Sequence, residues 1–468
     1  MRNTKGLWMF AFVLVLLDTY IFTVLKFLIS NYSNKAKVIV YSTFWLLTVC
    51  SIAIVILLPQ LYFNPKYKLF ITYAFSMVFG LFFFKLIIVL FFLVDDVRRM
   101  LSWLVQKIMP TKVGAVTNAI QGVSRSHFIT WLGIGVGTTV YGTLLWGFGN
   151  KYKYLVRNVK LKYSNLPVAF NGLKIVQLSD IHSGSFTNKA AVKKGIEKII
   201  ALQPDLILFT GDLVNNLASE MDDYKDEFAK LSAPLGVYSI LGNHDYGDYY
   251  LWPDRDESIY QKQKQSQLEY CELLEKNIDY VNWAPQKIAQ VQKANAELVA
   301  NYKLYSPQQQ SNIEQLYNTH KGMGWQLLLN KHVVLKKDND SIALIGIENW
   351  GARGNFPKYG NLQQAHLGTE SIPFKILLSH DPSHWQAQVL PYYPDIDLML
   401  AGHTHGMQFG VELPGFKWSP VQYVYKQWAG VYEAAKQKLY VNRGFGFLGY
   451  PGRVGILPEI TFIQLYNA

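Results

Sequence analysis

The sequence predicts two regions of different fold class, an all-α membrane domain over residues 1–150 and an α/β domain over residues 165–468. Three observations support this division. Half of the 468 residues are hydrophobic and only 17% are charged, which is typical of a chain with membrane segments. Apolar stretches of membrane-spanning length are confined to the first 150 residues. Beyond residue 165, short apolar strands alternate with helical stretches.

Four apolar stretches precede residue 150, and each is long enough to cross about 30 Å of hydrocarbon. We expect transmembrane helices at about 7–25, 38–59, 69–94 and 128–147. A single cleaved signal peptide is excluded because there are four such segments. Residues 95–121 alternate apolar and charged side chains, which favours an amphipathic helix at the membrane interface. Asp18 and Lys85 lie within spans, where pairing or snorkelling explains two isolated charges better than a transport pathway does.

The net charge of +12 belongs to the membrane half. Residues 1–150 contain 13 Lys and Arg but 3 Asp and Glu, whereas the remainder is nearly balanced. No basic domain is left to bind a phosphate backbone, so we expect no nucleic-acid partner. The first and third loops between spans carry eight Lys and Arg against four on the other side, which favours cytoplasmic loops and an extracytoplasmic C-terminal domain. Residues 151–164 are predicted to be a basic juxtamembrane linker.

The α/β half places polar side chains directly after five predicted strands. Residues i and i+2 of an extended chain lie on the same side, so Asp180 and His182 should converge, as should His403 and His405. Oxygen and imidazole ligands without a thiolate suit Mn, Fe or Zn. Each motif alone is weak, and the combination is specific. The strands 172–178, 205–210, 237–241, 374–378 and 395–400 end in Ser179-Asp180-Ile181-His182, Gly211-Asp212, Gly242-Asn243-His244-Asp245, Ser379-His380-Asp381 and Gly402-His403-Thr404-His405-Gly406.

In this order the motifs resemble those of the calcineurin-like metallophosphoesterase superfamily, over about residues 165–468. Within it, the chain resembles the membrane-anchored bacterial branch related to the UDP-diacylglucosamine pyrophosphatases. The resemblance implies a four-layer α/β/β/α sandwich of two mixed sheets. It also implies two divalent metal ions, with Asp212 bridging them and His244 stabilising the transition state and protonating the leaving oxygen. The first ion would be held by Asp180, His182, Asp212 and His405, and the second completed by Asn243, His380 and His403.

These expectations point to a membrane-anchored phosphodiesterase or pyrophosphatase in which a metal-bridging hydroxide attacks phosphorus. The partners expected are the lipid bilayer, in a bacterial plasma (inner) membrane, and a phosphoester substrate that membrane tethering favours as lipid-borne. The sequence identifies no protein partner. The alternative is a binding or sensory protein that keeps the fold without turnover. The presence of all seven expected ligands and of His244 favours the enzyme.

Three further features leave alternatives open. Arg443 and Arg453 flank a Gly-rich, aromatic loop that could bind phosphate or form an ordinary turn. Residues 250–326 are predicted to be a helical insertion, with helices at 257–276 and 286–304 and a turn at 305–310. The insertion could be a lid, a docking surface or an inert addition. Asp245 could support His244 or a local turn, and His384 could support the metal ligands or face solvent.

Overall fold

The structure is a computed structural model that describes residues 5–61, 65–108, 125–262, 265, 305–354, 356 and 358–468. The chain divides into two compact units, each of which is considered by itself. The first comprises Met1–Phe148 with Gly449–Pro451, and the second comprises Gly149–Leu448 with Gly452–Ala468.

Four helices form the first unit. They are α1 (Lys5–Leu28), α2 (Asn34–Leu61), α3 (Pro65–Ile108) and α4 (Arg125–Gly147). Each contains a stretch long and apolar enough to cross a membrane, which confirms the expected number of spans.

The third helix is longer than predicted. We expected its span to end at residue 94 and a separate amphipathic segment to follow, but α3 continues without a break to Ile108. The helix continues through a turn of charged residues whose side chains pair with one another. Arg98 Nη2 lies 2.8 Å from an oxygen of Asp95, three residues earlier, and such pairs stabilise a helix. The rest of the predicted segment, residues 109–121, lies outside the described residues.

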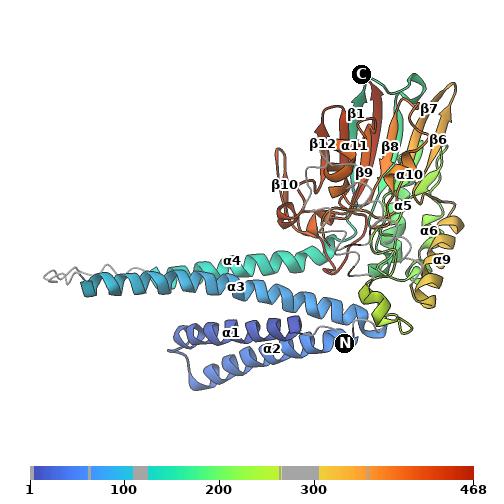
Figure 1. Ribbon diagram of the computed structural model, residues 1–468. Coiled ribbons are helices and arrows are strands. Elements are labelled where there is room, and N and C mark those ends of the chain that lie inside the picture. Colours follow the sequence, from blue (N-terminus) through green and yellow to red (C-terminus); the bar gives the residue numbers. More distant parts are fainter. Residues whose placement is uncertain are drawn as a thin grey trace. The chain divides into compact units, whose positions relative to one another are not determined.

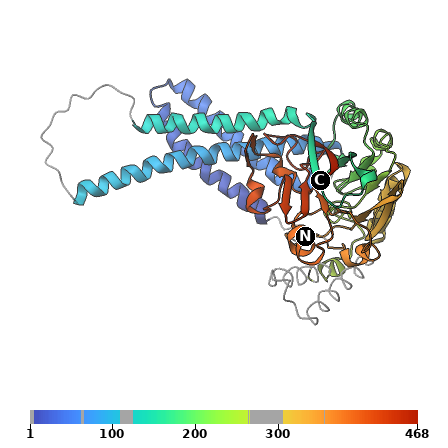
Figure 2. The same cartoon turned by 90° about the horizontal axis from the view of Figure 1, so that it is seen from above.

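Helices α3 and α4 lie side by side (Figures 1 and 2). Glycines of α4 make this close approach possible. A Cβ atom added to Gly133 would lie 2.8 Å from the Cβ of Phe91, and one added to Gly137 would lie 3.0 Å from the ring of Phe84. Small residues spaced four apart are a common way for membrane helices to pack without a hydrophobic driving force.

The two charges inside the spans form a buried ion pair. Lys85 Nζ lies 2.8 Å from Asp18 Oδ1, and Thr48 Oγ donates a hydrogen bond of 2.6 Å to Asp18 Oδ2. All three side chains are buried, and they come from α3, α1 and α2 respectively. Of the two alternatives that the sequence left open, pairing is therefore confirmed, and together with Thr48 the pair joins three helices.

The second unit contains two six-stranded mixed sheets. The first sheet has the order β1 (Leu155–Tyr163), β14 (Glu459–Asn467), β2 (Leu173–Leu178), β3 (Leu206–Phe209), β4 (Val237–Ser239) and β5 (Gln326–Leu327). The second has the order β12 (Gly430–Ala434), β13 (Gln437–Val441), β9 (Leu398–Ala401), β8 (Lys375–Leu378), β7 (Asp340–Gly346) and β6 (Lys331–Lys337). Strands β2 to β5 run parallel in one sheet, as β7 to β9 do in the other.

Alternation along the strands produces the layers (Figure 1). Ile175 and Leu208 of the first sheet share one buried core with Ile376 and Leu400 of the second, so the sheets pack face to face. Their neighbours in sequence belong to a second core that includes residues of the helices. These helices are α5 (Lys189–Ala201), α6 (Lys225–Phe228), α9 (Pro307–Gly322), α10 (Leu362–His366) and α11 (Leu390–Tyr392). The expected four-layer α/β/β/α sandwich is confirmed.

The predicted basic linker is a strand. Residues 155–163 form β1, which pairs in parallel with β14 along its whole length. Leu161 and Tyr163 are buried while Lys160 and Lys162 are exposed. The lysines that suggested a collar at the membrane are thus the outward half of a period-two strand pattern.

The predicted insertion is too long at its C-terminal end. Residues 307–310, predicted to be a turn, begin helix α9, which is capped by the side chain of Ser306. Ile313 and Leu316 of α9 are buried in the core, and β5 follows at once. Residues 257–262 are helical as predicted, and most of the remaining insertion lies outside the described residues.

Candidate metal centre

All five predicted motifs follow the C-terminal ends of strands, at β2, β3 and β4 of one sheet and at β8 and β9 of the other. Since these strands run parallel within each sheet, their ends meet at one edge of the sandwich. Two groups of side chains there have ligand atoms within 4.8 Å of one another. They are Asp180, His182 and His405, and Asp212, His380 and His403.

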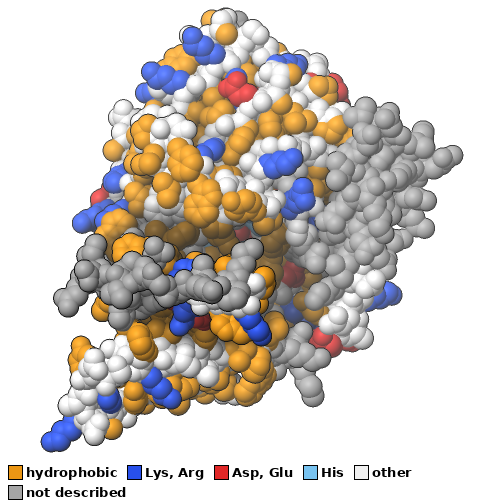
Figure 3. Space-filling view, turned by 90° about the vertical axis from the view of Figure 1, so that its left-hand side faces the viewer, with side chains coloured by type: hydrophobic (Ala, Val, Ile, Leu, Met, Phe, Trp, Pro, Cys, Tyr) orange, Lys and Arg blue, Asp and Glu red, His pale blue; other side chains and the backbone are white. Residues whose placement is uncertain are grey.

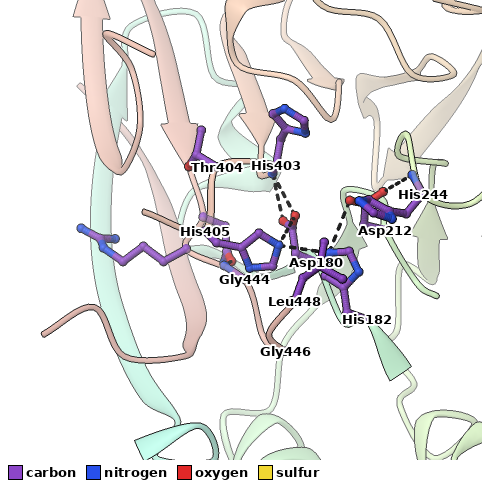
Figure 4. Close-up of polar contacts among 12 residues, drawn as sticks. Asp180, His182, Asp212, His244, His403, Thr404, His405, Gly444, Gly446 and Leu448 are labelled. Carbon is purple, nitrogen blue, oxygen red and sulfur yellow. Dashed lines mark hydrogen bonds and ion pairs between the residues drawn. The ribbon is translucent and has the colours of Figure 1, made fainter. Parts of the chain in front are cut away.

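The first group is held by Asp180 (Figure 4). Its Oδ1 lies 3.1 Å from His405 Nε2, while its two oxygens accept the backbone N–H of His403 at 3.1 and 3.0 Å. His182 Nε2 lies 3.0 Å from His405 Nε2. A close approach is possible because residue 402 is glycine, where a Cβ atom would lie 2.2 Å from an oxygen of Asp180.

The second group shares Asp212 with the first. Asp212 Oδ2 lies 3.2 Å from His380 Nε2 and 3.5 Å from His182 Nε2, so one carboxylate oxygen faces both groups. His403 Nδ1 lies 3.3 Å from His380 Nε2 and 2.9 Å from Asn243 Oδ1. The seven side chains expected as ligands therefore converge in one place.

Neighbouring hydrogen bonds decide which imidazole nitrogen can bind a metal. His380 Nδ1 lies 2.7 Å from the carbonyl oxygen of Thr210. Because a carbonyl can only accept, Nδ1 carries a proton, and Nε2 is the nitrogen that faces Asp212 and is left to bind a metal. A second ring nitrogen fixed in this way is typical of metal-binding histidines.

Electrostatics prepare the carboxylates for cations. Burial would raise the pKa of Asp180, but His405 and His380 outweigh it and hold that pKa below its usual range. Burial is likewise outweighed at Asp212, whose pKa His380 and His244 hold well below its usual range. Both are therefore anionic. Burial also lowers the pKa of His182, which keeps this imidazole neutral with a lone pair to donate.

His380 behaves differently, because Asp212 raises its pKa to about 10 against the effect of burial. A cation entering this group therefore displaces a proton from His380. With two anionic carboxylates, four imidazoles and an amide oxygen, and no thiolate, the donor set fits divalent ions of the Mn, Fe and Zn type.

The backbone is strained at five of the seven side chains. Asp180, His182, Asp212, His403 and His405 all have φ between +47° and +69°. Each such non-glycine residue in the left-handed region costs of order 1 kcal/mol or more. Strain concentrated at the ends of the strands marks this edge as a functional site.

His244 lies beside the second group without belonging to it. Its backbone N–H donates to Asp212 Oδ1 at 2.9 Å, and its Nδ1 lies 2.8 Å from the carbonyl oxygen of Asn215. The carbonyl requires a proton on Nδ1, which leaves Nε2 for proton transfer. The ring stands nearly at right angles to that of His182, with centroids 4.9 Å apart.

Three further residues support the centre: Asp245, for which the sequence left support of His244 or of a local turn open, and two tyrosines that sequence reasoning missed. The carboxylate of Asp245 accepts the backbone N–H groups of Asp212, Leu213 and Gly242 at 2.8–2.9 Å, so it orders the bridging loop. Tyr425 OH lies 2.9 Å from His403 Nε2, whereas Nδ1 of the same ring faces Asn243 and His380. Tyr249 OH accepts from Asn243 Nδ2 at 2.9 Å, which turns the amide oxygen toward His403. No local motif surrounds the two tyrosines, so no sequence signal marked them.

Arg443 and Arg453 are buried beside the centre and bonded within the protein. Arg443 Nη1 lies 2.6 Å from Glu459 Oε2, and Nη2 contacts Glu412. Arg453 donates to the carbonyl oxygens of Arg443, at 2.8 Å, and of Gly446. These contacts organise the Gly-rich loop, and phosphate binding by the two arginines stays a prediction. His384, by contrast, is buried against Trp350 and does not face solvent.

The sequence is similar to those of several known phosphoesterases and metallophosphoesterase-domain proteins. The chain is 29% identical over 321 residues to the UDP-2,3-diacylglucosamine pyrophosphatase LpxG of Chlamydia trachomatis, covering 65% of this chain and 88% of that protein. It is 28% identical over 360 residues to the uncharacterized metallophosphoesterase YkuE of Bacillus subtilis, covering 73% of this chain and 98% of that protein. It is 26% identical over 320 residues to a transmembrane protein with metallophosphoesterase domain of Danio rerio, covering 67% of this chain and 57% of that longer protein.

Two family models match. Residues 2–150 match the transmembrane domain of probable calcineurin-like phosphoesterases, and residues 173–407 match the calcineurin-like phosphoesterase domain. The second match covers half of the chain and contains all seven expected ligands. The chain therefore belongs to the calcineurin-like phosphoesterase family, as its motifs had indicated.

Proposed function

We propose that the protein is a membrane-anchored, metal-dependent phosphoric ester hydrolase that cleaves a phosphodiester or diphosphate bond. The observation that carries this proposal is the place of Asp212, whose Oδ2 faces His182 of one ligand group and His380 of the other. A carboxylate shared in this way suits two cations held close together, which is the arrangement of two-metal phosphoester hydrolases.

Divalent cations, when bound, supply a nucleophilic hydroxide at neutral pH and neutralise the phosphate oxygens. The chain's own residues do the rest. Asp180, Asp212 and the histidines hold the cations, and the bond from His244 Nδ1 to Asn215 leaves Nε2 as the nitrogen available for proton transfer. From there His244 can protonate the leaving oxygen as its charge develops. No covalent intermediate with a protein side chain is needed.

We further propose that the substrate is lipid-borne. Four spans in the same chain keep the catalytic unit near a bilayer, which raises the effective concentration of lipid headgroups. A relative at 29% identity carries the name of a lipid pyrophosphatase, in line with this class. The loop charges favour an extracytoplasmic catalytic unit in a bacterial plasma membrane, where nucleotide-linked lipids fit less well than lipid diphosphates or phosphodiesters.

The activity is tested with detergent-purified protein, Mn²⁺, a chromogenic phosphodiester and the matching monoester. We expect diester turnover that Asp212→Asn abolishes and that His244→Ala lowers about 10²–10⁴-fold. His332→Ala is the matched control, because His332 Nδ1 also lies 2.9 Å from a backbone carbonyl, that of Ala365, away from the centre. Metal-loaded protein that turns over neither compound nor any lipid phosphoester would favour a binding protein instead.

The side of the membrane is tested separately. Alkaline phosphatase fused after residue 468 should be active in intact cells, and green fluorescent protein at the same point should be dark. The reverse pattern would place the catalytic unit in the cytoplasm and restore nucleotide-linked lipids as candidate substrates.

A further inference from the structure

A two-stranded hairpin follows the last two ligands in the chain. It consists of β10 (Val411–Leu413) and β11 (Phe416–Trp418), which among the described residues form a separate two-stranded sheet. The register places Val411 opposite Trp418, Glu412 opposite Lys417 and Leu413 opposite Phe416. Directly opposed residues share a face, so one face carries four apolar side chains and the other carries the charged pair.

The charged face is the one turned toward the rest of the unit. Glu412 contacts both Arg157 and Arg443. Lys417 Nζ donates to the carbonyl oxygen of Ala429 and lies 4.5 Å from the ring centroid of Tyr432. Both charged side chains of the hairpin therefore have their partners inside the protein.

The apolar face is turned outward. Leu413 is 61% exposed and Phe416 is 56% exposed, and Val411 is exposed as well. A hairpin on the surface of a water-soluble domain normally has the opposite arrangement, with its apolar face on the core and its polar face in solvent.

The exposed surface extends beyond the hairpin. Ser419 Oγ donates to the carbonyl oxygen of Gly406 at 2.8 Å, which brings the end of the hairpin beside the loop that follows His405. Met407 of that loop and Tyr423 and Val424 after the hairpin are each more than half exposed. We call this set the hairpin surface: Met407, Val411, Leu413, Phe416, Tyr423 and Val424. Figure 3 looks onto the side of the molecule where β10 lies in Figure 1, and its upper part shows hydrophobic side chains with Lys and Arg among them.

We propose that the hairpin surface inserts into the interfacial region of the lipid bilayer. The composition fits a bilayer better than a protein partner. Aliphatic and aromatic side chains are combined with the exposed Lys426, and the one carboxylate of the segment is neutralised internally. Aromatic rings and lysines at the headgroup level are typical of interfacial anchors.

A bilayer is always close to the hairpin surface, because the four spanning helices of the same chain hold the catalytic unit at a membrane. Insertion would set the distance from lipid phosphates to the centre, since Met407 lies two residues after His405. This inference concerns membrane contact and does not depend on the phosphoesterase activity.

The test uses the full chain in nanodiscs of phosphatidylethanolamine and phosphatidylglycerol. In a background with Cys50→Ser and Cys271→Ser, an environment-sensitive fluorophore is attached at Leu413→Cys or, as a second probe of the same face, at Phe416→Cys. Leu367→Cys is the matched control. Leu367 is 73% exposed, directly follows helix α10 and lies far from the hairpin in the sequence. We expect a blue shift at residues 413 and 416 and quenching by lipids that carry a doxyl group near the headgroup, with neither at residue 367.

Other results would overturn the proposal in distinguishable ways. Emission at residue 413 like that at residue 367 would show a surface open to water. A blue shift without doxyl quenching would show that a protein, such as a second copy of the chain, covers the hairpin. The fluorescence does not use turnover, so a failure of the proposed activity would leave this result unaffected.

Discussion

Two of the buried clusters of charged side chains in the described residues, one in each unit, are built differently. In the helical unit, Asp18 meets one cation, Lys85, and one hydroxyl, that of Thr48. In the catalytic unit, Asp180 and Asp212 meet imidazoles whose ring nitrogens also face one another. The first cluster is complete with protein groups alone. The second brings together carboxylate oxygens and imidazole nitrogens in two groups of three side chains, and the ligand atoms of each group lie within 4.8 Å of one another.

The contrast separates a structural role from a chemical one. A buried pair with one charge of each sign needs nothing further and joins the helices that carry it. A cluster of carboxylates and imidazoles, held by strained backbone, suits cations. We therefore expect the same residue type, a fully buried aspartate, to serve stability in one unit and ion binding in the other. The four predictions below test this distinction, from the largest expected effect to the smallest.

The same substitution at the two aspartates should affect different properties. Asp180→Asn removes a charge that faces His405. We expect diester turnover to fall more than about 100-fold and metal content to be reduced, which is a larger loss than the removal of a residue that only supports a metal ligand typically causes. Asp18→Asn should leave turnover of a soluble diester unchanged. Metal analysis and steady-state kinetics measure both. Equal losses of turnover in the two variants would show that the clusters do not have separate roles.

Breaking the helical pair should cost stability. Asp18→Leu leaves Lys85 buried without its carboxylate, and we expect a loss of about 3 kcal/mol in the free energy of unfolding. The double variant Asp18→Leu with Lys85→Leu should recover most of it, because no charge is left unpaired. Thermal unfolding in detergent provides the comparison. A double variant as unstable as the single one would mean that the pair stabilises the helices by more than mutual neutralisation.

The hydroxyl of Tyr425 should matter through His403. Tyr425→Phe removes the group 2.9 Å from His403 Nε2, and we expect metal affinity to fall about 10–100-fold because the ring loses its fixed orientation. Metal titration followed by calorimetry measures this. Tyr432→Phe, which removes a hydroxyl bonded to the backbone of Trp428, is the matched control and should bind metal normally. Unchanged affinity in both variants would assign Tyr425 to packing alone.

The smallest effect concerns a carboxylate away from the centre. Burial raises the pKa of Glu348 to about 7, despite hydrogen bonds from Tyr246 and Asn330. The folded state therefore binds a proton that the unfolded state has lost, and stability should fall as pH rises from about 4.5 to 7. Glu348→Gln should remove part of this fall, making the variant the more stable protein at pH 8 with little difference at pH 4.

Unfolding temperatures across that pH range give the measurement. Glu197→Gln, on the exposed face of α5, should follow the wild-type curve. A Glu348→Gln curve parallel to that of the wild type would mean that Glu348 titrates normally in the folded protein.

Sequence reasoning succeeded where local pattern and chemistry coincide. The four spans follow from hydrophobic length, and β2, β3, β4, β8 and β9 follow from apolar runs that end in polar motifs. It was wrong where two explanations share one pattern. Lys160 and Lys162 fit a membrane collar as well as a strand edge, and only the pairing of β1 with β14 decides between them.

What the sequence by itself determined is the family and the set of candidate ligands that the structure brings together, because the types and order of these residues are chemically specific. Only the tertiary structure decided which nitrogen of each histidine faces the centre, where Asp212 lies between the groups, and that Tyr425 and Tyr249 support it. It also decided that the apolar face of the β10–β11 hairpin points outward. These features depend on contacts between residues distant in the chain, and such contacts form only when both sheets are assembled.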